Sequence, residues 1–166
     1  MSAIHIGDTG LFVAMGDIEN RRYRAVRTFA HRNKITFVLP ERVYEELTAT
    51  RSADRTLPID ATIDDGWVRV ADPLDYSMPL VSRVMDGVQR YIANADDRPE
   101  DEIERADAAL AGVAAHAFVD GSADHAYVYT TDNDAGEGIE TIFASEGYGD
   151  SITYVNGFRL VNDLVD

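Results

Sequence analysis

Short apolar runs recur along the chain and end in turn-forming residues, a pattern typical of β-strands. Their β-branched and aromatic side chains suit a pleated, buried surface. The predicted strands cover residues 3–6, 35–39, 67–71, 126–129 and 152–155. Between them, apolar residues recur every three or four positions, which predicts amphipathic helices. The predicted helices cover residues 11–15, 20–33, 42–51, 79–95, 100–119, 136–146 and 157–164, and residues 52–66 are predicted to form a loop.

The alternation of strands and helices predicts the architecture. Strands joined by helices form right-handed crossovers within a parallel sheet. A chain of 166 residues has about the size of one domain with one sizeable core. The sequence shows no internal repeat, low-complexity tract or linker. We therefore predict a single domain over residues 1–166, an α/β protein built as a three-layer α/β/α sandwich around a mostly parallel central sheet.

Composition narrows the classes of function. The chain has no cysteine, which excludes disulfides, thiolate metal sites and cysteine nucleophiles. No apolar run approaches the ~20 residues of a membrane span. The N-terminus lacks the basic and apolar regions of a secretory signal, so a cytoplasmic protein is expected.

The charge balance is acidic, with 30 Asp and Glu against 15 Lys and Arg, and all but one of those cations are Arg. Acid-rich, Lys-poor surfaces resemble those of proteins from salt-loving archaea. Because the Debye length is about 3 Å in 1 M salt, most of this self-repulsion is screened there. The net charge by itself therefore neither favours nor excludes a polyanionic partner.

Acidic residues follow directly after two of the predicted strands. Asp8 comes after the first strand, and residues 130–134 (TTDND) come after the strand at 126–129. Ligands of open α/β sheets bind outside the carboxyl ends of the strands, so Asp8 and Asp132 meet if their strands are neighbours. Carboxylates at a buried strand end favour a bound cation. Capping of the following helix is the alternative explanation for Asp132 and Asp134.

The helix predicted over residues 100–119 carries an acid among its apolar positions. At about 100° per residue, its buried stripe contains Ile103, Ala106, Leu110, Ala114 and Ala117. Asp107 projects into this stripe, about 40° from Ile103. A carboxylate that faces a core requires a cation, a pairing Arg or a raised pKa, so we predict a functional role for Asp107.

The helix predicted over residues 42–51 offers two glutamates. Val43 and Leu47 define its buried edge. Glu46 lies about 80° from the midline of that edge and can reach the site, whereas Glu45 lies about 180° away and should face solvent. The alternative is that both glutamates are ordinary exposed helix formers.

Together these positions form a set of hard oxygen ligands. The set comprises Asp8, Glu46, Asp107 and Asp132, with Asp134 in reserve. Carboxylates without His or Cys suit Mg²⁺ or Mn²⁺ much better than Zn²⁺. Because the gathered carboxylates would repel one another, divalent binding should also stabilise the fold.

The helix predicted over residues 20–33 concentrates the cations of the chain. With Lys34 just beyond it, this segment holds six of the 15 Lys and Arg residues. Surface pairing with acids elsewhere is one explanation. The other is a strip that holds phosphate groups beside an acidic site, with Arg21, Arg24 and Arg27 as candidate contacts.

Four short motifs, in this order, resemble those of the PIN-domain nucleases. They are an apolar strand leading into Asp8-Thr9, then Pro40-x-x-Val43-x-x-Glu46-Leu47, then Ala106-Asp107-Ala108-Ala109-Leu110, and then Val128-x-Thr130-x-Asp132-x-Asp134. Together they span nearly the whole chain. Two features depart from the family pattern. Thr131 stands where many members have Asn, and residues 52–79 are longer than in the smallest toxin-type members.

The resemblance implies an activity and partners. Family members bind one or two Mg²⁺ or Mn²⁺ ions and cleave single-stranded RNA, in many cases as the toxin of a toxin–antitoxin pair. Hydroxide attack on the phosphate would leave 5′-phosphate and 3′-hydroxyl ends. An antitoxin protein and a second copy of the chain are the implied protein partners.

The resemblance also implies roles for individual residues. Asp8, Glu46, Asp107 and Asp132 match the catalytic metal-binding acids, and Asp134 matches a supporting acid. Thr9 and Thr130 match supporting positions, where Thr130 would orient an acid or hydrogen-bond a phosphate. In this interpretation three residues of the helix predicted over residues 20–33 would hold the RNA backbone, namely Arg21, Arg24 and Arg27.

Two other interpretations remain open. A structure-directed DNA 5′-nuclease would use a similar acid cluster, but such enzymes usually add a helical DNA-gripping element and further acids, for which the chain has little room. A non-catalytic PIN-like module would bind RNA or a protein. The intact set of acids argues against this second alternative, because a module without catalysis has no need to bury carboxylates.

Overall fold

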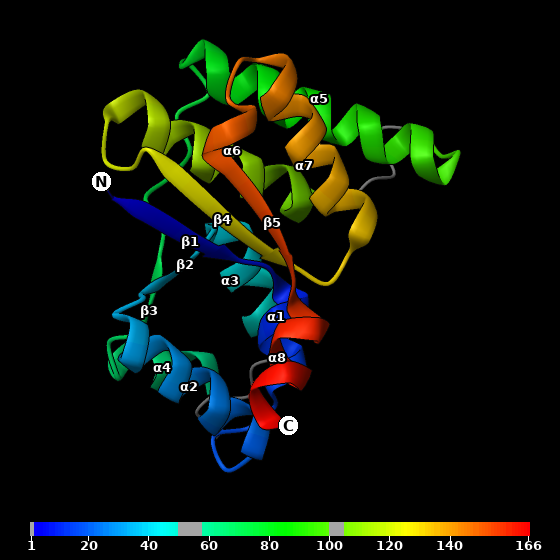
Figure 1. Ribbon diagram of the computed structural model, residues 1–166. Helices are drawn as coiled ribbons and strands as arrows, with labels where there is room; N and C mark the ends of the chain where they lie inside the picture. The colour runs from blue at the N-terminus through cyan, green and yellow to red at the C-terminus, as the bar shows by residue number, and fades with distance from the viewer. Residues whose placement is uncertain (1, 50–57, 100–104) are drawn as a thin grey trace.

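The central sheet is parallel throughout, and its strand order puts β1 beside β4. The computed structural model, shown in Figure 1, describes residues 2–49, 58–99 and 105–166. Five strands form the sheet in the order β3-β2-β1-β4-β5, and each neighbouring pair is parallel. They are β1 (Ala3–Gly7), β2 (Phe37–Leu39), β3 (Val68–Val70), β4 (His125–Thr130) and β5 (Ile152–Asn156). The predicted α/β sandwich with a parallel sheet is confirmed.

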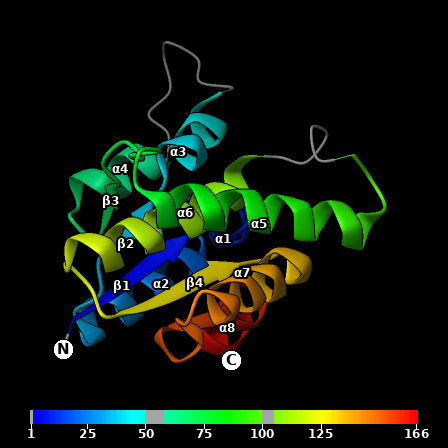
Figure 2. The same cartoon turned by 90° about the horizontal axis from the view of Figure 1, so that it is seen from above.

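Helices cover both faces of this sheet. Helices α5, α6 and α7 lie on one side, whereas α1, α2, α4 and α8 lie on the other and α3 stands near the carboxyl end of β2 (Figures 1 and 2). The helices are α1 (Thr9–Met15), α2 (Arg21–Asn33), α3 (Glu41–Thr48), α4 (Pro58–Asp64), α5 (Pro79–Asp96), α6 (Arg105–Asp120), α7 (Asn133–Ser145) and α8 (Gly157–Val165). A short 3-10 turn, Gly149–Ser151, precedes β5.

Each side of the sheet has its own apolar core. The first core joins the strands to α5, α6 and α7 and contains Val84, Leu110 and Phe143. The second contains Leu11 and Phe37 and joins the strands to α1, α2, α3, α4 and α8. Apolar area removed from water is the main favourable term in folding, so the two cores hold the sheet rigid between them.

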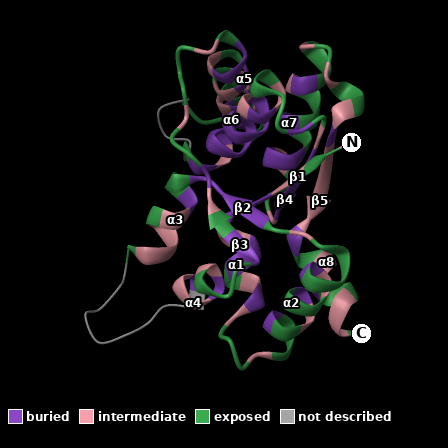
Figure 3. Ribbon diagram, turned by 90° about the vertical axis from the view of Figure 1, so that its left-hand side faces the viewer, coloured by how far each residue is buried: buried purple, intermediate pink, exposed green. Residues whose placement is uncertain are grey.

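Helix α6 is buried around its whole circumference along its middle. Every residue from 108 to 115 is buried, as the ribbon coloured by burial shows (Figure 3). This corrects the prediction of a single buried stripe on the helix at 100–119, whose Ile103 lies outside the described residues. The reason is that α6 packs against α5 as well as against β1. Its small side chains permit this close approach: a Cβ added at Gly112 would lie 2.7 Å from Met85 Sδ.

The structure corrects two other boundaries. The described part of the predicted loop at 52–66 contains α4, whose Ile59 is buried in the second core. Helix α7 begins at Asn133 rather than at 136, so Gly136 lies inside the helix instead of in a turn. Gly136 packs against the ring of Tyr154, which leaves no space for a side chain there. A glycine that signals a turn in the sequence is here a close-packing position.

None of the helices among the described residues is both long and apolar enough to cross a bilayer.

Candidate metal-binding site at the centre of the sheet

The reversal in strand order places two predicted site residues side by side. The chain passes outward from β1 to β2 and β3, and then outward on the other side from β4 to β5. Ligands of open α/β sheets bind in the crevice at such a switch point. Asp8 follows β1, and Asp132 stands two residues after the end of β4. The Asp8 N–H donates to the carbonyl oxygen of Tyr129 at 3.0 Å, which joins the two strand ends.

Asp8 is a buried carboxylate with only 7% of its surface exposed. Its Oδ1 accepts the Leu11 N–H at 2.7 Å and so caps α1. Its Oδ2 accepts the Thr130 hydroxyl at 2.6 Å and the Thr131 N–H at 3.1 Å. Burial raises the pKa of Asp8, and the nearby Asp132 charge adds to this, whereas the three hydrogen bonds act in the opposite direction. A bound cation would favour the ionised form.

Thr130 connects the two acids. It is fully buried at the end of β4. Its hydroxyl donates to Asp8 Oδ2 and accepts the Asp132 N–H at 3.1 Å. Thr130 therefore fixes the position of one carboxylate and of the backbone that carries the other.

Replacement of Thr130 by Val tests this connection, because Val retains the branched shape and removes the hydroxyl. Asp8 loses a donor and the Asp132 N–H loses an acceptor, so the free energy of unfolding should fall by about 1–3 kcal/mol. Urea denaturation in molar KCl measures the change. Thr130→Ser keeps the hydroxyl and should lose much less. Equal losses in the two variants would show that the methyl group, rather than the hydroxyl, stabilises this position.

Asp132 caps α7, as one of the two interpretations of the sequence anticipated. Its Oδ1 accepts the N–H groups of Asp134 at 2.9 Å and Ala135 at 3.2 Å. The residue is exposed, and its Oδ2 accepts no hydrogen bond from the described residues. Capping uses one oxygen of the carboxylate and leaves the other for a ligand.

Glu46 reaches the same edge of the sheet from α3. Its Oε2 accepts the hydroxyl of Thr9, the residue after Asp8, at 2.6 Å. Glu45 points elsewhere: its side chain is 67% exposed and forms a 3.6 Å ion pair with Arg42. The helical geometry expected from the sequence therefore separates these glutamates as the structure does.

Asp107 lies at the start of the described part of α6 and is half-buried. The preceding residue, Ala106, packs in the second core together with Leu11, Val43 and Tyr129. Helix α6 also contacts α3, which carries Glu46. The structure thus brings this turn of α6 to the carboxyl ends of the strands.

Asp134 is engaged with α5, through an acid that the sequence analysis missed. A hydrogen bond with Asp96 raises the pKa of Asp134, and burial and the neighbouring charges of Asp132, Asp96 and Glu137 add to the increase. Asp96 also forms a 3.0 Å ion pair with Arg98. The helix predicted from the sequence ends at residue 95, whereas α5 includes Asp96. The available signal was spacing: Asp96 comes four residues after the buried Ile92, so it lies on the same side of α5, exposed in the last turn.

Of the three candidate arginines of α2, one forms an ion pair and the other two line a common depression. Arg27 forms a 2.6 Å ion pair with Asp65, just before β3, and therefore sits near the amino ends of the strands. This is the surface pairing that the sequence left open, and it places Arg27 away from Asp8. Arg21 donates to the carbonyl oxygen of Val165 at 2.7 Å, and with Arg24 it lines a depression between α2 and α8.

Comparison with known proteins settles the family. All 166 residues match the family model described as the halobacterial PIN domain. The chain belongs to this family. Both the resemblance to PIN domains and the expected origin in salt-loving archaea are thereby confirmed. A search of curated proteins finds no match. PIN domains are generally nucleases and usually use divalent metal ions, and this chain has their nuclease-type fold.

The donor chemistry of this PIN domain fits Mg²⁺ or Mn²⁺. Each carboxylate oxygen can accept two hydrogen bonds, so Asp8 Oδ1 and Glu46 Oε2, with one each, retain a lone pair. These are hard oxygen ligands, as both ions prefer. Among residues 2–49, 58–99 and 105–166, however, no three His, Asp or Glu side chains lie close enough together to form a complete site. Mg²⁺ is usually bound through one or two carboxylates and keeps several waters, so a set of three protein ligands is not required.

Proposed function

We propose that this PIN domain is a metal-dependent endoribonuclease that cleaves single-stranded RNA. The observation that supports it most directly is the buried carboxylate of Asp8 at the switch point, beside Asp132. An ionised carboxylate in such surroundings is costly unless a cation compensates it. Membership of the PIN-domain family, whose members are generally nucleases, supports phosphodiester hydrolysis as the reaction.

In this proposal Asp8, Glu46, Asp107 and Asp132 hold Mg²⁺ or Mn²⁺, and Asp134 supports them. When bound, the ion supplies Lewis acidity for water attack on the phosphodiester. Thr130 holds Asp8 in place, and Thr9 does the same for Glu46. In-line attack at phosphorus leaves 5′-phosphate and 3′-hydroxyl ends. Arg21 and Arg24 are the α2 residues that we retain as candidate backbone contacts.

Cleavage assays with several nucleic acids in molar KCl test the proposal. We expect Mn²⁺-dependent cleavage of single-stranded RNA, lost in EDTA and in Asp132→Asn. End-group analysis should find 5′-phosphates. The control is Asp124→Asn, because Asp124 is exposed and directly precedes β4, at the opposite edge of the sheet.

Other outcomes of the same assays would contradict the proposal. Preferred cleavage of flapped DNA would indicate a structure-directed DNA nuclease. Binding of RNA without cleavage of any substrate would indicate a non-catalytic module. A toxin role, an antitoxin partner and a homodimer remain predictions. Mass measurement of the purified protein would check the homodimer, and co-expression with a candidate antitoxin followed by the same measurement would check the partner.

A further inference from the structure

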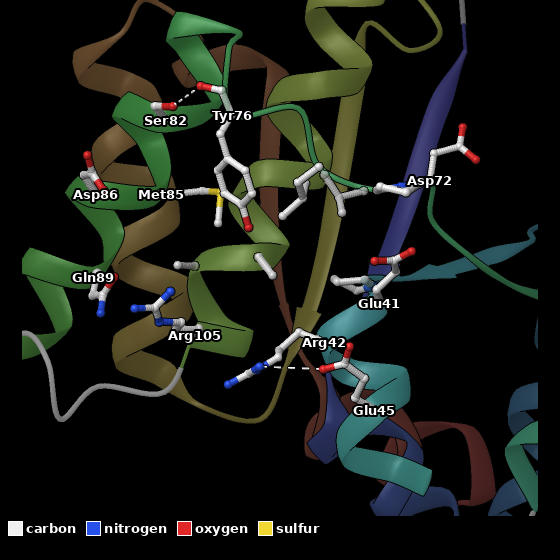
Figure 4. A pocket seen from close by; sticks show the side chains of 16 residues that line it. Glu41, Arg42, Glu45, Asp72, Tyr76, Ser82, Met85, Asp86, Gln89 and Arg105 are labelled. Atoms are coloured by element: carbon white, nitrogen blue, oxygen red, sulfur yellow. Dashed lines mark hydrogen bonds and ion pairs between the residues drawn. The ribbon is translucent and has the colours of Figure 1, made fainter. Parts of the chain in front are cut away.

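A cleft of about 500 Å³ opens at the same edge of the sheet as the proposed metal site. Its walls are α3, α5, α6 and the segment that leads from β3 to α5 (Figure 4). Pro40, directly after β2, and Asp72, shortly after β3, line it, so it lies at the carboxyl edge of the sheet. Two of its walls are the helices that carry Glu46 and Asp107. The described residues that line the cleft include none of the five candidate acids, so the cleft shares their edge of the sheet without containing them.

The floor of the cleft is apolar and closely packed. Leu74 and Met85 converge on Gly112, where an added Cβ would lie 3.0 Å from Leu74 Cδ2. Ala108 and Ala109 of α6 complete the floor and are buried. Small residues on α6 thus leave an apolar floor against which a planar group can pack.

Tyr76 stands over this floor with its backbone held and its ring free to receive a ligand. Its carbonyl oxygen accepts the Ser82 hydroxyl at 2.6 Å. Asp75 Oδ1 accepts the Ser77 N–H at 3.0 Å and the Ser77 hydroxyl at 2.5 Å. The residue is 64% exposed, and its ring stacks on no other aromatic ring among the described residues. Figure 4 shows the ring beside Met85, with Arg105 nearby.

The charges of the cleft favour a neutral planar group over a phosphate chain in its interior. Four acids line it, namely Glu41, Glu45, Asp72 and Asp86, against two cations. One cation, Arg42, is paired with Glu45, and the other, Arg105, forms no ion pair with a described residue. Arg105 can therefore contact one phosphate at the mouth. Counterion release contributes little in molar salt, so base stacking must supply more of the affinity.

We propose that this cleft binds a base of the single-stranded RNA, stacked on Tyr76, at the same edge of the sheet as the proposed metal site. The inference rests on the proposed nuclease function, and it adds the residue that holds the strand. Tyr76 is a positioning residue: it contacts a base and not the reacting phosphate. Its held backbone reduces the entropy that binding costs.

Fluorescence anisotropy with a short labelled single-stranded RNA tests whether the cleft binds a base. EDTA in molar KCl prevents metal-dependent cleavage during the measurement. Tyr76→Ala should bind about 10–100-fold more weakly than the wild type, because it removes one base–aromatic stack. Tyr76→Phe retains the ring and should bind like the wild type. Val119→Ala, an exposed change at the far end of α6, is the surface control. Circular dichroism checks that each variant is folded.

Kinetics with Mn²⁺ provide the second measurement. Tyr76→Ala should raise KM by the same factor and leave kcat at saturating RNA unchanged, because stacking acts equally on the bound substrate and the transition state. Equal affinity of wild type and Tyr76→Ala, or no saturable binding by the wild type, would overturn the inference even if RNA is cleaved. Weaker binding by Tyr76→Ala without Mn²⁺-dependent cleavage by the wild type would overturn the nuclease proposal and retain the RNA-binding cleft.

Discussion

Replacement of Asp8 by Asn is expected to reduce Mn²⁺-dependent cleavage of single-stranded RNA by about 100-fold or more. The substitution removes the negative charge of the buried carboxylate that we place at the centre of the site. Metal ions contribute several kcal/mol of charge stabilisation to such reactions. Each 1.4 kcal/mol corresponds to a factor of ten in rate, so the loss of a charged ligand should be large.

The same variant should remain folded, which makes the activity measurement interpretable. Asn is as good an N-cap as Asp, so its oxygen can still accept the Leu11 N–H at the start of α1. Its NH₂ group would then face the Thr131 N–H, at a local cost of about 1–3 kcal/mol. Circular dichroism and thermal melting in molar KCl check the fold. Activity within a few-fold of both the wild type and Asp124→Asn would remove Asp8 from the mechanism.

Saturating Mn²⁺ is expected to raise the thermal midpoint of the wild type and to have little effect on Asp8→Asn. A ligand present at 100 times its Kd stabilises the folded state by about 2.7 kcal/mol. For a chain of this size that corresponds to roughly 5–10 °C. The physical reason is that an ion relieves both the desolvation of Asp8 and its repulsion by Asp132.

The stabilisation by Mn²⁺ should also grow with pH. The pKa of Asp8 in the folded state is raised above its ordinary value of 3.8. In EDTA, the stability that protonated Asp8 contributes is therefore fully present below pH 3.8 and is lost as the pH rises through the raised pKa. Mn²⁺ binds the ionised form, so its effect on the midpoint should be small at low pH and full once Asp8 is ionised.

Differential scanning fluorimetry across pH, with Mn²⁺ or EDTA, measures this behaviour, and Asp124→Asn again provides the matched control. An equal rise in the midpoint of Asp8→Asn would show that the ion binds elsewhere. A rise that is independent of pH would show that Asp8 is not the ligand whose ionisation limits binding.

The sequence by itself determined the local elements and the ends of the strands that carry acids. Side chains alternate with a period of two in strands and recur every three to four residues in helices, so a pattern over a few residues reveals which faces are buried. For this reason Asp8 and Asp132 were correctly placed after β1 and β4. The same helical geometry separated Glu46, which accepts the Thr9 hydroxyl, from the exposed Glu45.

The tertiary structure decided which strands, helices and side chains lie next to one another. The order β3-β2-β1-β4-β5 makes β1 and β4 neighbours, which lets Thr130 bridge Asp8 and the backbone of Asp132. The burial of α6 on all sides, the pairing of Asp96 with Asp134 and the exposed ring of Tyr76 over its cleft also depend on packing between distant segments. The periodicity of a sequence shows which face of a helix or strand is apolar, but it does not show which other element covers that face. The proposed site is formed by contacts between such elements, so only the tertiary structure could assemble it.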